Sequence, residues 1–135
     1  MRRQSKKFQE RSKQAKAVRN ALIARAKKCM ICGASPWSPV HPFPELNQLC
    51  CHEIAGGPLR QKFLDLPFGI LVLCYFCNQY EVEDKGKWPQ ARQLAVLMKK
   101  SPENYDLQAF NYAVNPNAPR RIEQHEVDEW LKEDG

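Results

Sequence analysis

The sequence predicts a small α+β fold in which two short strands around a metal site are flanked by helices. The length of 135 residues suggests a single domain, and ten prolines and six glycines leave room for only modest secondary-structure elements. Two apolar runs of strand length, residues 49–54 and 68–74, predict an antiparallel pair. We expect this small core to be held together by two Cys-x-x-Cys pairs, which are Cys29 with Cys32 and Cys74 with Cys77.

Those four cysteines predict a structural zinc site. Two thiolates two residues apart fit one tetrahedral ion, and two such pairs complete a closed site with Zn–S bonds of about 2.3 Å. Because the sequence has no long apolar run, we expect a soluble protein of a reducing, cytoplasmic compartment, without membrane contact or disulfides. His41 lies in a proline-rich loop and is expected at the surface, since four thiolates already satisfy zinc.

Apolar residues recur three and four positions apart after the second cysteine pair, which predicts helices. The first should end at Gly86, and the next should begin at Pro89 and stop near Ser101. Further helices are expected through Phe110 and through Trp130. The chain then divides into a basic N-terminal helix or arm, a zinc-stabilised core and a helical C-terminal extension, at residues 1–28, 29–86 and 87–135.

Positive charge is concentrated before the first cysteine. Residues 1–28 carry a net charge of +10, whereas the whole chain carries +6. Such a segment can supply salt-sensitive, sequence-independent affinity for nucleic acid, although charged runs also serve only as solvated surface. The candidate nucleic-acid contacts are Arg11, Lys13, Lys16 and Arg19, and beyond a glycine pair Arg60 and Lys62, for which ordinary surface charge is the alternative.

Several short motifs follow one another in a fixed order. They are Cys-x-x-Cys-Gly at 29–33, His-Glu-Ile at 52–54, two glycines at 56–57 and Leu-Cys-x-x-Cys-Asn at 73–78. Over about residues 29–80 this order resembles the zinc-knuckle branch of the HNH endonuclease family, which has the ββα-metal fold. The resemblance implies a metal-dependent endonuclease that hydrolyses DNA phosphodiester bonds. It also implies that the cysteines hold a structural zinc and that a strand histidine is the general base.

In the family, the catalytic divalent ion is bound by an acid or histidine beside the general base and by a terminal His or Asn. The terminal ligand corresponds to Asn78, whose amide oxygen suits Mg²⁺ or Mn²⁺. The pair His52-Glu53 departs from the usual Asp-His or His-His, so two registers are open. His52 is the metal ligand and Glu53 the base in one, and in the other His52 is the base and Cys51 takes the place of the acid.

Chemistry favours His52 as the base, because imidazole titrates near neutral pH, and it favours Glu53 as a metal ligand rather than a soft thiolate at Cys51. The central asparagine of the family is also missing, since Gly69 occupies its place. The sequence therefore carries three hypotheses. They are a DNA endonuclease, a non-catalytic zinc-stabilised nucleic-acid-binding module, and a zinc-stabilised protein-interaction domain.

Overall fold

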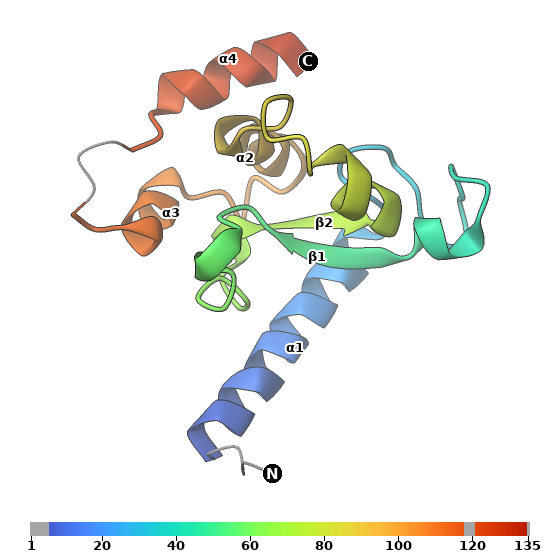
Figure 1. Ribbon diagram of the computed structural model, residues 1–135, viewed down its shortest axis with the longest axis horizontal. Helices are drawn as coiled ribbons and strands as arrows, with labels where there is room; N and C mark the ends of the chain where they lie inside the picture. Colours follow the sequence, from blue (N-terminus) through green and yellow to red (C-terminus); the bar gives the residue numbers. More distant parts are fainter. Residues whose placement is uncertain (1–5, 118–120, 135) are drawn as a thin grey trace.

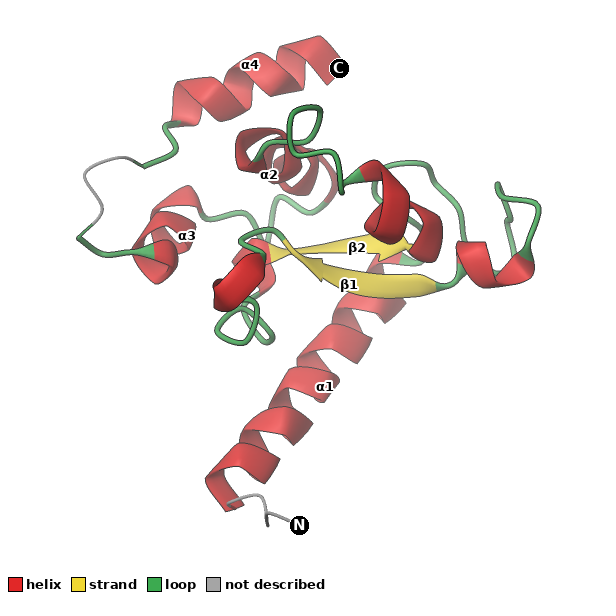
Figure 2. Ribbon diagram, viewed as in Figure 1, coloured by secondary structure: helices red, strands yellow, loops and turns green. Residues whose placement is uncertain are grey.

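A computed structural model describes residues 6–117 and 121–134 and places a two-stranded antiparallel sheet among four α-helices (Figure 1). The strands are β1 (Leu49–Glu53) and β2 (Ile70–Cys74), and the helices are α1 (Lys6–Ala26), α2 (Gln90–Lys100), α3 (Leu107–Val114) and α4 (Gln124–Asp134). Short 3-10 turns and loops fill the remainder (Figure 2). Residues 1–5 of the predicted N-terminal segment and 118–120 of the C-terminal extension lie outside the described residues.

The predicted strand pair is confirmed. Leu49 pairs with Cys74 at one end of the ladder and Glu53 pairs with Ile70 at the other. Every residue of β2 is buried, whereas β1 alternates in its last three positions, with Cys51 and Glu53 buried and His52 half-buried. Because successive strand side chains point to opposite faces of a sheet, the side chains of His52 and Glu53 leave β1 on opposite sides.

The connection between the strands is braced by an aromatic side chain. A Cβ atom at Gly69 would lie 2.3 Å from Cδ1 of Phe63, which is fully buried. No side chain fits at Gly69 without displacing that ring, so an asparagine there is excluded by packing. Phe63 also contacts Phe68 and Phe110, with ring centroids 6.2 and 5.5 Å apart. The loop between the strands is therefore supported by a packed phenylalanine.

The helix after β2 is shorter than expected. It begins at Tyr75 but widens into a single π-turn over Cys77–Glu81, where the amide of Val82 donates to the carbonyl of Cys77 at 3.0 Å. The prediction of a helix as far as Gly86 was therefore wrong. Asp84 instead accepts hydrogen bonds from the amides of Gly86 and Lys87, which forms a turn that competes with helix continuation.

The basic N-terminal segment forms helix α1, which packs on the sheet. The C-terminal part of α1 contacts both strands, with Leu22, Ile23 and Ala26 packed against the core, while its N-terminal part extends away from the sheet (Figure 1). The helix ends at Lys27, whose φ of +65° is the left-handed conformation that closes helices. None of the described helices is long and apolar enough to cross a membrane.

The C-terminal helices share one apolar core with the sheet and the cysteines. Leu94, Phe110 and Val127, from three different helices, are fully buried in the same cluster as β2. Helix α4 packs on α2, where the Arg92 guanidinium lies 3.8 Å from the Trp88 ring centroid and pairs with Asp134 at 2.9 Å. The three predicted segments of the chain therefore form a joint core.

Candidate functional site

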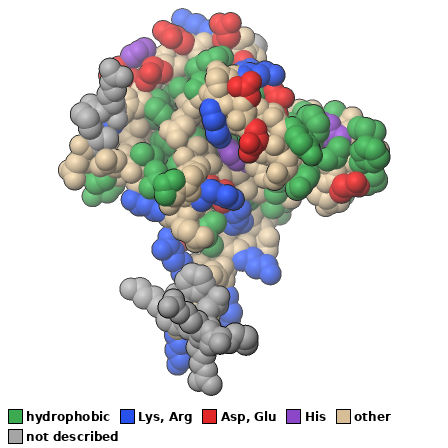
Figure 3. All heavy atoms as spheres, viewed as in Figure 1, with side chains coloured by type: hydrophobic (Ala, Val, Ile, Leu, Met, Phe, Trp, Pro, Cys, Tyr) green, Lys and Arg blue, Asp and Glu red, His purple; other side chains and the backbone are tan. Residues whose placement is uncertain are grey.

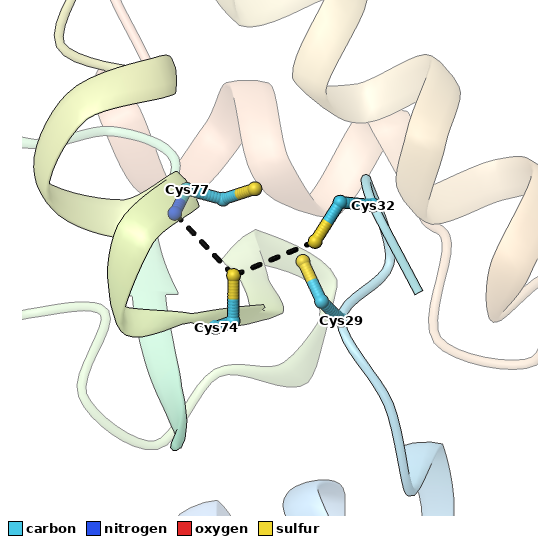
Figure 4. A group of neighbouring side chains, drawn as sticks. All are labelled: Cys29, Cys32, Cys74 and Cys77. Atoms are coloured by element: carbon cyan, nitrogen blue, oxygen red, sulfur yellow. Dashed lines mark hydrogen bonds between the residues drawn. The ribbon is translucent and has the colours of Figure 1, made fainter. Parts of the chain in front are cut away.

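The four predicted zinc ligands meet at one point. Cys29 and Cys32 lie on the turn after α1, Cys74 ends β2 and Cys77 begins the π-turn (Figure 4). All four Sγ atoms lie within 4.8 Å of one another, and those of Cys32 and Cys74 are 3.5 Å apart. Tetrahedral zinc requires S–S distances of roughly 3.8 Å. This cluster therefore has the ligand types and the size that suit zinc.

Some thiols of the cysteine cluster are protonated at neutral pH when no metal ion is bound. The Cys77 thiol is hydrogen-bonded to Cys29, which lowers the pKa of Cys29 to about 4 and raises the pKa of Cys77. Burial raises the pKa of Cys32 to about 12. Without a cation the group holds protons at neutral pH, since four thiolates would repel one another. Zinc would replace those protons, so its affinity should fall with acidity.

His41 lies against the cluster, contrary to the expectation of a surface loop residue. Its Nε2 is 3.4 Å from Sγ of Cys74 and 3.6 Å from Sγ of Cys32, and its ring stacks on Phe76 with centroids 4.4 Å apart. Asn47, which is buried, orders the loop by accepting from the backbone amides of Val40 and His41. An Nε2–H group at this place can donate to both thiolates.

Replacing His41 by alanine should weaken zinc retention by roughly tenfold, because hydrogen-bond partners of metal ligands contribute affinity of that order. Competition with a chromophoric chelator measures this effect. His125→Ala is the matched control, since that histidine is exposed on α4, where it pairs with Glu123 far from the cysteines. Unchanged zinc affinity in His41→Ala would contradict the role given to Nε2.

A cleft of about 320 Å³ lies at the end of β1. Its lining includes the predicted catalytic residues, the glycine loop and two basic side chains. These residues are His52, Glu53 and Asn78, Gly56 and Gly57, and Arg60 and Lys85. Gly56 and Gly57 have φ of +64° and +52°, a conformation that glycine adopts without strain and that turns the chain around the cleft. The strand, the glycine loop and the π-turn thus converge on one cavity.

His52 and Asn78 are in direct contact. Nδ1 of His52 lies 3.0 Å from Oδ1 of Asn78, which follows the zinc-cluster residue Cys77. The second ring nitrogen, Nε2, lies 2.9 Å from Oε1 of Gln93 on α2. Burial lowers the pKa of His52 below its ordinary value, so the ring is neutral at pH 7 and can accept a proton.

Glu53 is held by two arginines. Its Oε1 accepts from Nη1 of Arg19 at 2.9 Å, and its Oε2 lies 3.7 Å from Nε of Arg60. Arg19 also donates to the backbone carbonyl of Cys51 at 3.1 Å. The carboxylate therefore serves as an internal anchor for α1, and the oxygen facing Arg60 is the more loosely held of its two oxygens.

The predicted nucleic-acid contacts divide into two groups. Arg11, Lys13, Lys16, Arg60 and Lys62 are exposed. Arg19 is only one-quarter exposed and is committed to Glu53 and Cys51 inside the fold. In the space-filling view, Lys and Arg side chains gather along α1 where it leaves the body of the molecule (Figure 3). The described part of α1 therefore offers a basic surface without the contribution expected from Arg19.

Gln93 and His41 are the contacting residues that sequence reasoning missed. Gln93 lies 41 positions after His52, within an apolar helix pattern that gives no sign of a polar contact. A histidine between two cysteine pairs was the available signal for His41. Among the described residues, the cysteines are the group of His, Cys or acidic side chains that come close enough to share a metal.

No protein-family model, curated protein or solved structure matches this chain. Inference about its function therefore depends on the cysteine cluster, the cleft at the end of β1 and the basic surface of α1.

Proposed function

We propose that the chain is an HNH-type endonuclease of the ββα-metal class that hydrolyses DNA phosphodiester bonds, with His52 as the general base. The observation that supports this proposal most is the contact of His52 with Asn78 in a cleft beside the four-cysteine cluster. A base and a hard oxygen donor at one cavity are the groups that metal-assisted hydrolysis requires.

The imidazole of His52 is suited to remove a proton from water. Its ring is half-buried, borders the cleft and is neutral at pH 7 because burial lowers its pKa. A neutral imidazole can accept a proton without first losing one. Positioned general bases contribute about 10²–10⁴-fold to rate, so His52 should carry a large part of the chemical step.

Asn78 and Glu53 are the residues that would hold a catalytic Mg²⁺ or Mn²⁺. The amide oxygen of Asn78 and the loosely held Oε2 of Glu53 are hard donors on the same cleft, and the neighbouring Cys77 fixes the backbone of Asn78. A bound divalent ion supplies charge that stabilises the phosphorane-like transition state and the leaving oxygen. Arg60 and Lys85 line the cleft and can contact a phosphate.

The test is nicking of supercoiled plasmid with Mg²⁺ or Mn²⁺. His52→Ala should lower the nicking rate at least about 100-fold while DNA binding and zinc content remain, and Asn78→Ala should do the same. His125→Ala, an exposed histidine on α4, is the matched control and should nick as the wild type does. Equal nicking by wild type and both cleft variants would exclude this cleft as the active site.

The basic surface of α1 is proposed to bind the DNA backbone. Changing Arg11, Lys13 and Lys16 to Gln should lower the slope of log affinity against log salt by up to about 3, because each phosphate contact contributes roughly 0.9. The change of Lys99, Lys100 and Lys132 to Gln removes the same charge elsewhere and is the control. Equal slopes in the two triple variants would contradict a specific role for α1.

A non-catalytic zinc-stabilised nucleic-acid-binding module is the second candidate. It is favoured by one observation, namely that both ring nitrogens of His52 and both carboxylate oxygens of Glu53 already have protein partners. Under this alternative, wild-type protein binds DNA with the same salt dependence but leaves the plasmid intact with either ion.

A further inference from the structure

We infer that Gln93 is a positioning residue that holds a proton on Nε2 of His52 and fixes the direction of its imidazole ring. Gln93 belongs to α2, outside the stretch of about residues 29–80 that carries the motifs. The catalytic meaning of this inference rests on the proposed function, whereas the placement of the proton depends only on the contacts of Gln93.

The amide of Gln93 can adopt only one orientation. Its side chain is 1% exposed, and its Nε2 donates to the backbone carbonyl of Trp88 at 2.9 Å. A reversed amide would set its own oxygen against that carbonyl and leave both oxygens without a donor. An unsatisfied buried polar group costs about 1–3 kcal/mol, which disfavours the reversed amide.

The fixed amide determines which nitrogen of His52 must carry a proton. Oε1 of Gln93 faces Nε2 of His52 at 2.9 Å, and an amide oxygen can only accept, so Nε2 must carry a proton. The other ring nitrogen, Nδ1, lies 3.0 Å from Oδ1 of Asn78, which is half-buried at the cleft.

Gln93 also fixes the direction of the ring. The χ2 torsion of histidine is broad, so a ring without a partner at Nε2 can turn and exchange the places of its two nitrogens. The ring is held by Gln93 on one side and by Asn78 on the other. It therefore connects helix α2 with the π-turn. The C-terminal extension thereby becomes part of the catalytic apparatus.

The experiment records ¹⁵N–¹H correlations of histidine rings in the full zinc-loaded chain. Only three histidines are present, and His52→Ala assigns the signal. In the wild type, Nε2 of His52 should resonate as a protonated nitrogen with a proton protected from exchange. Gln93→Met removes the acceptor at similar size, so the Nε2 proton should exchange rapidly and nicking should fall on the order of tenfold.

Gln93→Glu keeps an oxygen acceptor at the same distance and should retain the protected Nε2 proton. Lys99→Met, on the exposed side of the same helix, should leave both the ring signals and nicking unchanged. A merely structural role for Gln93 would lower stability in Gln93→Met without altering proton exchange at His52. A wild-type ring without a proton on Nε2, or a protected Nε2 proton that survives Gln93→Met, would overturn the inference.

These outcomes separate the inference from the proposed function. If the wild type shows the protected Nε2 proton but nicks no plasmid, Gln93 still positions His52 and only the endonuclease proposal fails. If the wild type nicks and His52→Ala does not, while the ring signals ignore Gln93→Met, the endonuclease proposal stands and the role of Gln93 is rejected.

Discussion

Replacement of Cys74 by serine should unfold the core at room temperature. Cys74 is fully buried, ends β2 and lies 3.5 Å from Cys32 Sγ, so its loss removes one of four zinc ligands from the centre of the fold. Structural zinc sites contribute about 10–16 kcal/mol in zinc-finger peptides, which is comparable to the whole stability of a domain. Loss of near-ultraviolet circular dichroism and a red shift of the tryptophan fluorescence measure the effect.

Cys50→Ser is the matched control for this experiment. Cys50 is half-buried on the same sheet, but its thiol donates to the carbonyl of Leu73 and does not belong to the cluster. A serine hydroxyl can make the same hydrogen bond, so we expect retained zinc and a loss of about 1 kcal/mol. A strong chelator should unfold the wild type and Cys50→Ser alike. Cooperative folding of Cys74→Ser with wild-type stability would contradict a structural role for the metal.

Replacement of Arg19 by methionine should lower the free energy of unfolding by about 3 kcal/mol. Glu53 is 5% exposed, and Arg19 provides its shortest ion pair, at 2.9 Å, and a hydrogen bond to Cys51. Removing Arg19 leaves a buried carboxylate with only the longer contact to Arg60, and this costs more than an exposed ion pair contributes. Urea unfolding of the zinc-loaded protein measures the difference.

Two further variants make the Arg19 result specific. Arg11→Met changes an exposed arginine on the same helix, bonded to the Gln61 carbonyl at 3.3 Å, and should shift stability by less than about 0.5 kcal/mol. The double variant Arg19→Met with Glu53→Met removes both charges and should recover most of the loss. Equal stabilities of Arg19→Met and Arg11→Met would mean that Arg19 is free to contact nucleic acid, as its sequence context predicts.

Local patterns were sufficient for the two strands and the cysteine cluster. The apolar runs at 49–54 and 68–74 correspond to β1 and β2, and the Cys-x-x-Cys spacing gave the four residues that meet. Each of these signals is contained within a few neighbouring residues. The chemistry of a thiolate pair and the period of a strand do not depend on the rest of the chain.

The contacts that the sequence did not disclose join distant elements. Arg19 and Glu53 are 34 positions apart, and His52 and Gln93 are 41 apart. Arg19 lies in a segment with the composition of a solvated basic helix, and Gln93 lies in a segment with an amphipathic helix pattern. Neither residue can therefore be told from its neighbours in the sequence. Gly69 is a similar case, since only the packed position of Phe63 shows that a side chain at Gly69 would clash.

X-ray absorption at the zinc edge of the wild-type protein tests the central claim most directly, namely that four thiolates bind one zinc ion and His41 supports them from outside. The account predicts one zinc per chain with four sulfur atoms at about 2.3 Å and no nitrogen ligand. A shell of three sulfur atoms and one nitrogen at about 2.0 Å, or protein purified without chelator that holds no zinc, would contradict it.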